Sequence, residues 1–218
     1  MSAWRDAPIS IADDLFLVAL DERTGRVRLH HHALSLGLAA ALLAELTLLD
    51  HVGYADGKIK VPSGDNAAVT AHHRTMVDQI AAEPDHPVPI WLSFFAQTAP
   101  DVVAARLVAR GFLRKEASRG LLRTKEAYFG TDESALAWRT LRLANVISRR
   151  DVRNWEDGML VALLDATGLA EHVLWHGSPD DIGNLRDIVA GVSEDPFLGV
   201  LVAQVSALIA AGVMTQRK

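Results

Sequence analysis

Residues 33–49 read ALSLGLAAALLAELTLL, and Glu45 is their only charged residue. Alanine, leucine and other unbranched side chains dominate the stretch and are strong helix formers. A membrane-crossing helix needs about 20 apolar residues, whereas this run is shorter, carries a glutamate near one end and continues directly into polar residues. Because a helix that is apolar on every face is buried on every face in a globular protein, the stretch predicts a central core helix.

Signals for further helices lie on both sides of this core. Ser10, with Asp13 three residues later, indicates a helix start before IADDLFLVAL, and residues 21–25 read as a turn. We expect one mainly α-helical globular domain over residues 1–218, with one or two short β-hairpins. Its other predicted elements are a strand pair within 53–64, helices at 72–82, 90–97 and 100–110, a hairpin at 112–129, and helices beginning near Asp132, Asn154, Ser178 and Asp195, the last ending at Gly212.

Composition and charge limit the classes of protein to which the chain can belong. The 218 residues contain no cysteine, which excludes disulfides and thiolate sites. The N-terminus lacks a basic start followed by an apolar run, so we expect a cytoplasmic protein. The net charge is −5, yet residues 101–125 carry seven Lys or Arg against two acids, and residues 139–153 carry five Arg against one acid. Such blocks either attract anions or form solvated surface.

Motifs for catalysis, cofactors and metals are missing from the sequence. It contains no GxGxxG, GxxxxGK[ST], HExxH or GxSxG. His30, His31 and His32 are consecutive, and on a helix such residues point about 100° apart, so they cannot converge on one ion without other ligands. We therefore predict no catalytic residues, no cofactor and no metal.

The predicted hairpin is the clearest candidate for a binding site. Its arms, read as surrounding Ser118 to Gly120, are rich in basic residues, and Leu121 and Leu122 fall at its tip. Cations among lipid headgroups with leucines in the interface suit an anionic membrane. Alternatively, the two leucines belong to one strand, one packed inward and one exposed. The basic residues are Arg114, Lys115, Arg119, Arg123 and Lys125.

A winged-helix arrangement is an alternative interpretation of the same region. A helix, a glycine and a hairpin follow one another, and Arg106 and Arg110 share a helix face from which they could contact phosphates. The helix that would read DNA bases, VVAARLVAR, is mostly apolar and offers few side chains for that purpose. The sequence therefore argues against nucleic acid as the partner.

Four segments together resemble the Golgi phosphoprotein 3 family in its shorter, bacterial form. They are IADDLFLVALDERTGRV at 11–27, ALSLGLAAALLAELTLLDHV at 33–52, LVARGFLRKE at 107–116 and WEDGMLVALLDATGLAEHVL at 155–174. The resemblance extends over residues 9–213. It implies a single helical domain around a buried helix, and a non-enzymatic peripheral membrane protein. Eukaryotic members bind phosphatidylinositol 4-phosphate, retain Golgi glycosyltransferases and insert a hydrophobic hairpin, which corresponds to the one around Leu121 and Leu122.

The headgroup site of the family is substituted in this chain. By alignment the family's tryptophan corresponds to His30, and its three arginines correspond to Ala39, Gln97 and Pro100. Recognition of an inositol phosphate requires clustered cations, which alanine, glutamine and proline do not supply. His30 retains a ring donor, and His31 or Arg106 could compensate.

The leading hypothesis is an adaptor that binds anionic membrane lipid in general and recruits a protein partner. The alternatives are a protein-interaction module without lipid binding and a nucleic-acid-binding regulator. The sequence specifies neither the lipid nor the oligomeric state. The predicted lipid-binding residues are His30, Arg106, Arg114, Lys115, Arg119, Leu121, Leu122 and Arg123.

Overall fold

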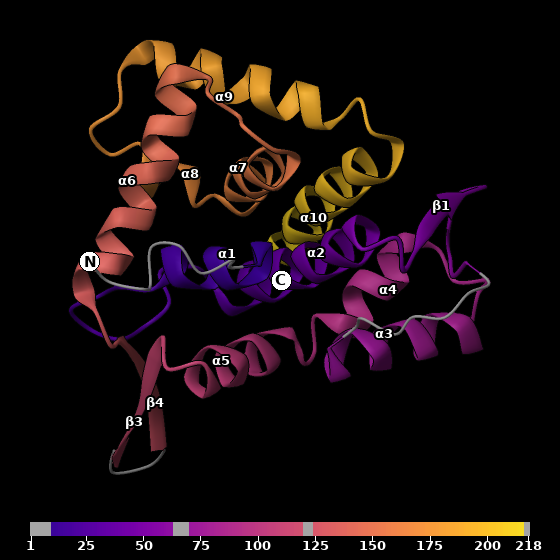
Figure 1. Ribbon diagram of the computed structural model, residues 1–218, viewed down its shortest axis with the longest axis horizontal. Helices are drawn as coiled ribbons and strands as arrows, with labels where there is room; N and C mark the ends of the chain where they lie inside the picture. The colour runs from indigo at the N-terminus through magenta and orange to yellow at the C-terminus, as the bar shows by residue number, and fades with distance from the viewer. Residues whose placement is uncertain (1–9, 63–69, 120–123, 216–218) are drawn as a thin grey trace.

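Helices dominate the fold, as the sequence predicts. The computed structural model describes residues 10–62, 70–119 and 124–215, which form ten helices and two antiparallel hairpins (Figure 1). The helices are α1 Ile11–Ala19, α2 His31–Leu48, α3 Ala71–Ala82, α4 Val88–Phe95, α5 Ala99–Ala109, α6 Glu133–Arg149, α7 Trp155–Thr167, α8 Ala170–Val173, α9 Pro179–Val192 and α10 Pro196–Thr215. The strands are β1 Gly53–Ala55, β2 Lys58–Lys60, β3 Leu113–Arg119 and β4 Thr124–Gly130.

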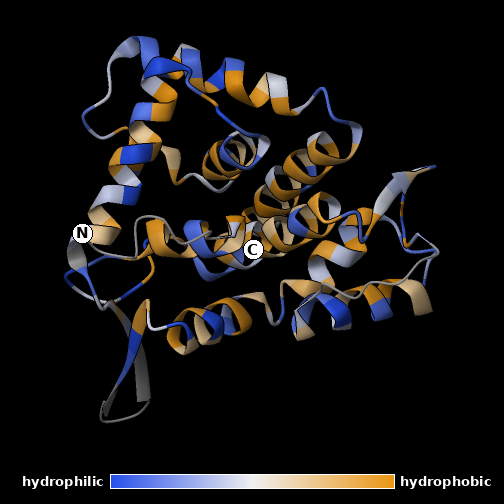
Figure 2. Ribbon diagram, in the orientation of Figure 1, coloured by the Kyte–Doolittle hydropathy of each residue, from blue (hydrophilic) through white to orange (hydrophobic). Residues whose placement is uncertain are grey.

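Helix α2 is the core helix that residues 33–49 predict. Every residue from Ala33 to Leu46 is buried, and α2 packs against α1, α4, α5, α7 and α10. Figure 2 shows it as an apolar helix in the middle of the molecule. At Gly37 an added Cβ would lie 2.7 Å from Thr167 of α7 and 3.2 Å from Leu15 of α1, so the missing side chain lets the three helices approach closely.

Two helices are long and apolar enough to cross a membrane by length and composition alone. The corresponding stretch of α2 is 78% buried in the protein, whereas that of α10 is only 28% buried. Burial on all sides explains the apolar character of α2. Helix α10 packs on α2, α7 and α4 but leaves much of its uncharged surface outside the core.

The helix starts follow the predicted caps. Ser10, Asp132 and Asn154 each accept a hydrogen bond from a backbone N–H of the first turn, and Ser178 forms a capping box with Asp181. Such caps satisfy donors that have no partner within the helix.

Several predicted boundaries differ from the structure. Helix α4 spans Val88–Phe95 and not 90–97, and the short helix α8 was not predicted. Helix α10 continues past Gly212 to Thr215, because this glycine serves a close contact and does not end the helix: an added Cβ would lie 2.8 Å from the His32 ring. The arms of the second hairpin are also longer than predicted. Ser118 and Arg119 belong to β3, where they pair with Lys125 and Thr124.

Candidate functional site

The β3–β4 hairpin projects from the helical body below α6 and beside α5 (Figure 1). Its strands pair in register from Leu113 opposite Gly130 to Arg119 opposite Thr124. Residues 120–123, which include Leu121, Leu122 and Arg123, lie outside the described residues, and so does the side chain of Arg119. The roles predicted for these four residues therefore stay predictions.

The base of the hairpin is attached to the turn that follows α1. The backbone N–H of Tyr128 donates to the carbonyl oxygen of Gly25 at 2.8 Å. Gly25 has a φ of 64°, and a Cβ there would lie 2.7 Å from the Phe129 ring. The Tyr128 ring also meets Phe16 of α1 edge to face, with ring centroids 5.9 Å apart. These contacts fix the direction in which the hairpin leaves the body.

Two predicted lipid-binding cations lie on the described part of β3. The Arg114 side chain is 58% exposed and forms an ion pair with Glu116. Its guanidinium lies 5.0 Å from the centre of the Phe129 ring, and the ammonium of Lys115 lies 5.9 Å from the centre of the Tyr128 ring. The aromatic residues of β4 therefore support basic groups at the base of the hairpin, as cation–π contacts do.

Arg106 lies in a buried ion-pair cluster, away from the exposed position that lipid binding would favour. Its Nε donates to Asp13 Oδ1 at 2.8 Å and its Nη2 donates to Ser10 Oγ at 2.7 Å. Arg110, one turn later on α5, places Nη1 2.9 Å from the other oxygen of Asp13. The Asp13 side chain is fully buried and the Arg106 side chain is 19% exposed. Both arginines that a winged helix would direct at DNA thus contact an acid of the same chain.

Glu45, the only charge in the central helix, joins this cluster from α2. Its Oε1 accepts a hydrogen bond from the Ala12 N–H at 2.8 Å, and its Oε2 lies 3.1 Å from His73 Nε2 and 3.6 Å from Arg106 Nη1. Burial alone would raise the pKa of this carboxyl, but the contacts with His73, Arg106 and Ala12 outweigh burial and lower it. The charge is retained because three other helices, α1, α3 and α5, supply partners for it.

Two arginines of the second basic block are also paired with buried acids. Arg139 and Arg142 of α6 both contact Asp14 of α1, at 2.8 and 3.3 Å, and Arg142 also contacts Asp157 of α7. Burial raises the pKa of both Asp13 and Asp14, against the neighbouring guanidinium groups. Adjacent acids in the first turn of a helix are ordinarily partners of the helix dipole, but the structure places Asp13 and Asp14 at the centre of two ion-pair networks. In the sequence, Asp13 and Asp14 stand between apolar residues on both sides, and that pattern was the only indication that they would be buried.

The positions that the sequence resemblance matches to the family's headgroup site lie apart from any cationic cluster among the described residues. His30 is exposed and is the N-cap of α2, where its Nδ1 accepts from the His32 N–H at 3.3 Å. Ala39 is completely buried in the core. Gln97 and Pro100 lie at the junction of α4 and α5. Among the described residues there is no group of three or more His, Asp or Glu placed to hold a metal.

Comparison with known proteins agrees with this architecture. A search of curated proteins found no match. The family model described as Golgi phosphoprotein 3 (GPP34) matches residues 11–209, which include all the helices from α1 to α9 and most of α10. The chain therefore belongs to the Golgi phosphoprotein 3 family.

Proposed function

We propose that this protein is a non-enzymatic adaptor that associates peripherally with anionic membrane through the β3–β4 hairpin. The observation that carries the proposal is the projection of a basic hairpin from the helical body (Figure 1). Residues 113–130 contain five Lys or Arg and two Glu. Each basic residue close to an anionic surface contributes on the order of 1 kcal/mol of attraction. Family membership supports the same role.

General attraction to acidic lipid fits this chain better than recognition of one phosphoinositide. A specific phosphate site requires several cations with defined hydrogen-bond geometry, and the corresponding positions hold His30, Ala39, Gln97 and Pro100. Arg106 is the cation that could replace the family's arginines, but it already donates hydrogen bonds to Asp13 and Ser10. The proposed contact therefore involves the hairpin, with Arg114 and Lys115 at its base and Arg119, Leu121, Leu122 and Arg123 toward its turn.

Flotation of the full chain with vesicles tests the proposal. We expect binding to vesicles of phosphatidylcholine with phosphatidylserine, and none to phosphatidylcholine alone. Leu121→Asp and Arg123→Glu should each weaken this binding. Arg153→Glu is the matched control, since Arg153 is 79% exposed and, within the part of the chain that the structure describes, pairs with Asp151 of its own loop. Failure of the unmodified chain to float with acidic vesicles at low salt would contradict the proposal.

The same assay separates general from specific lipid recognition. Vesicles in which phosphatidylinositol 4-phosphate replaces phosphatidylserine at equal total charge should bind to the same extent. Markedly tighter binding to the phosphoinositide would show that the substituted site still recognises its headgroup.

A protein-interaction module without lipid binding is the second candidate, and a surface groove favours it. The groove has a volume of about 540 Å³ and lies between α6 and the connection from α8 to α9. Its apolar lining includes Trp175, which is 78% exposed, and Leu141, which is 61% exposed. Exposed aromatic side chains beside apolar grooves are typical of protein interfaces. Two results together would favour this function: the chain does not bind acidic vesicles, and Trp175→Ser abolishes its binding to a protein partner.

A further inference from the structure

A pocket on the side of the molecule away from the hairpin has no part in the proposed membrane contact. It has a volume of about 570 Å³ and lies where the end of α2, the start of α7, the end of α9 and the start of α10 meet. This volume is in the range of small-molecule sites. The apolar side chains that line it are Leu48, Val152, Trp155, Ile188, Val192 and Leu198.

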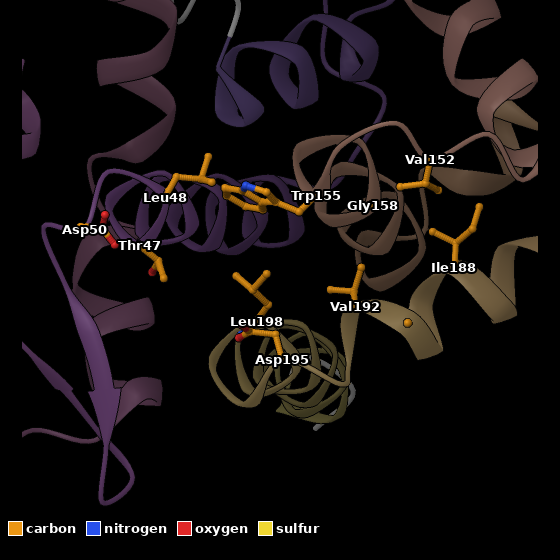
Figure 3. A pocket seen from close by; sticks show the side chains of 11 residues that line it. Thr47, Leu48, Asp50, Val152, Trp155, Gly158, Ile188, Val192, Asp195 and Leu198 are labelled. Carbon is orange, nitrogen blue, oxygen red and sulfur yellow. The ribbon is translucent and has the colours of Figure 1, made fainter.

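The shape of the pocket is set by one aromatic ring and two glycines. Figure 3 shows the indole of Trp155 extending across the pocket toward Leu48, with Val192 and Leu198 on the opposite side. Gly158 of α7 and Gly191 of α9 also line it. A Cβ added at Gly191 would meet nothing within 4 Å, which shows that the space beside this residue is empty of protein.

The charged groups of the pocket are all negative. None of the described residues that line it is basic, whereas Asp50 and Asp195 both contribute to its wall. One oxygen of Asp195 accepts from the N–H groups of Phe197 and Leu198, each at 2.9 Å. Its second oxygen has no protein partner among the described residues, and the same holds for both oxygens of Asp50. Both aspartates are exposed, so these oxygens face solvent at the mouth of the pocket.

From this combination we infer that the pocket binds a small apolar molecule that carries a protonated amine. The hydrocarbon or aromatic body of such a ligand would displace water from the aliphatic wall and stack on Trp155, which is favourable in proportion to the apolar area buried. Its ammonium group would lie at the edge of the pocket, where Asp50 and Asp195 contribute negative potential. An anionic ligand would be repelled by the same groups, and a neutral one would gain no attraction between opposite charges.

A series of three probes with one hydrocarbon chain tests the charge preference. Octylamine hydrochloride, 1-octanol and sodium octanoate share eight carbons and differ in the charge of the head. Each is titrated into the isotope-labelled full chain at low salt, and binding is followed by NMR at the Trp155 indole N–H and the Gly158 and Gly191 amides. We expect the octylammonium ion to bind roughly 3- to 10-fold more tightly than octanol, as two partly solvated charge pairs would give, and octanoate to bind most weakly.

Two conservative changes isolate the carboxylates. Asp195→Asn keeps a side-chain oxygen able to cap α10, and Asp50→Asn suits the positive φ of 55° at that position. The double variant should bind octylammonium and octanol with equal affinity while octanol binding stays unchanged. A preference for octylammonium that survives this change would overturn the inference.

Filling the pocket provides the steric test. Gly191→Leu, checked for folding by its NMR spectrum, should weaken binding of all three probes, because it adds a bulky side chain at a residue that lines the pocket. The inference is also overturned if octanol or octanoate binds as tightly as octylammonium, or if the resonances that shift belong to residues outside the pocket. The asparagine variants and the probe series decide the matter even if Gly191→Leu does not fold.

Discussion

The guanidinium of Arg106 donates from Nε to Oδ1 of Asp13 at 2.8 Å, although the two residues are 93 positions apart in the chain. This contact joins α5 to the first turn of α1, and Asp13 is completely buried in it. An arginine that the sequence presents as a surface cation is thus part of the interior. Arg106 should therefore contribute to the stability of the fold and not to lipid binding.

Arg106→Met should destabilise the fold without weakening the proposed lipid contact. Removing one partner of a buried ion pair costs about 3 kcal/mol, because the other charge stays buried with fewer partners. Arg110 remains beside Asp13 and limits the loss. Urea denaturation measures the change, and Arg153→Met is the control, with an expected change of about 0.5 kcal/mol or less for an exposed pair. Equal effects of the two substitutions would contradict the structural role of Arg106.

Gly25→Ala should loosen the hairpin, whereas Gly57→Ala should not. Both glycines have positive φ, 64° and 77°, so alanine strains the backbone similarly at each. Only at Gly25 would the new methyl group meet the Phe129 ring. Hydrogen exchange of the Tyr128 amide, which donates to Gly25, reports the difference. We expect exchange to accelerate about 5-fold, equivalent to about 1 kcal/mol, and an unchanged rate in Gly25→Ala would refute the anchoring role of this contact.

Stability should fall as the pH is lowered below about 6.5, in part because of His72. Burial lowers the pKa of this histidine, and the neighbouring His73 and Arg106 lower it further, against the opposite influence of Glu45. The unfolded chain therefore binds the proton at a higher pH than the folded chain does. The free energy of unfolding is largest above the pKa of the unfolded state, and it decreases as the pH falls toward the lower pKa of the folded state. Burial also lowers the pKa of His172.

Replacing His72 by glutamine should reduce this pH dependence. The thermal midpoint of the wild type should decline more steeply than that of His72→Gln between about pH 7.5 and pH 5.5. A second substitution, His172→Gln, should flatten the curve further because both histidines shift in the same direction. Parallel curves for the wild type and the double variant would exclude these two histidines as the cause.

Membrane association should depend on salt and on the base of the hairpin. Exposed charges are screened over about 10 Å at 0.1 M salt and about 3 Å at 1 M, so flotation with phosphatidylserine vesicles should be lost as salt rises. Arg114→Gln combined with Lys115→Gln should weaken binding about 10- to 30-fold, at about 1 kcal/mol for each residue. Arg149→Gln with Arg153→Gln removes the same charge elsewhere and should have little effect. Binding that is indifferent to salt would mean that charge does not drive it.

Local sequence information was sufficient for the longer helices and for several of their starts, but not for the short helix α8. Ser10, Asp132, Asn154 and Ser178 were predicted as caps and lie at the starts of their helices, because a cap depends on hydrogen bonds within the next three residues. The end of α10 was predicted wrongly. Gly212 resembles a helix stop in sequence, and only its contact with His32 of α2 explains why glycine is there.

The site was less predictable because it depends on contacts between distant segments. The sequence by itself determined a buried central helix and a basic hairpin, since apolar runs, turn residues and clustered charges are local properties. Tertiary structure alone decided which of those charges are available. It placed Asp13 and Asp14 between arginines of α5 and α6, and it left Arg114 and Lys115 on an exposed strand. The physical reason is that a charge is available to a ligand only if folding leaves it exposed, and pairing across some 90 to 130 residues leaves no trace in the local sequence.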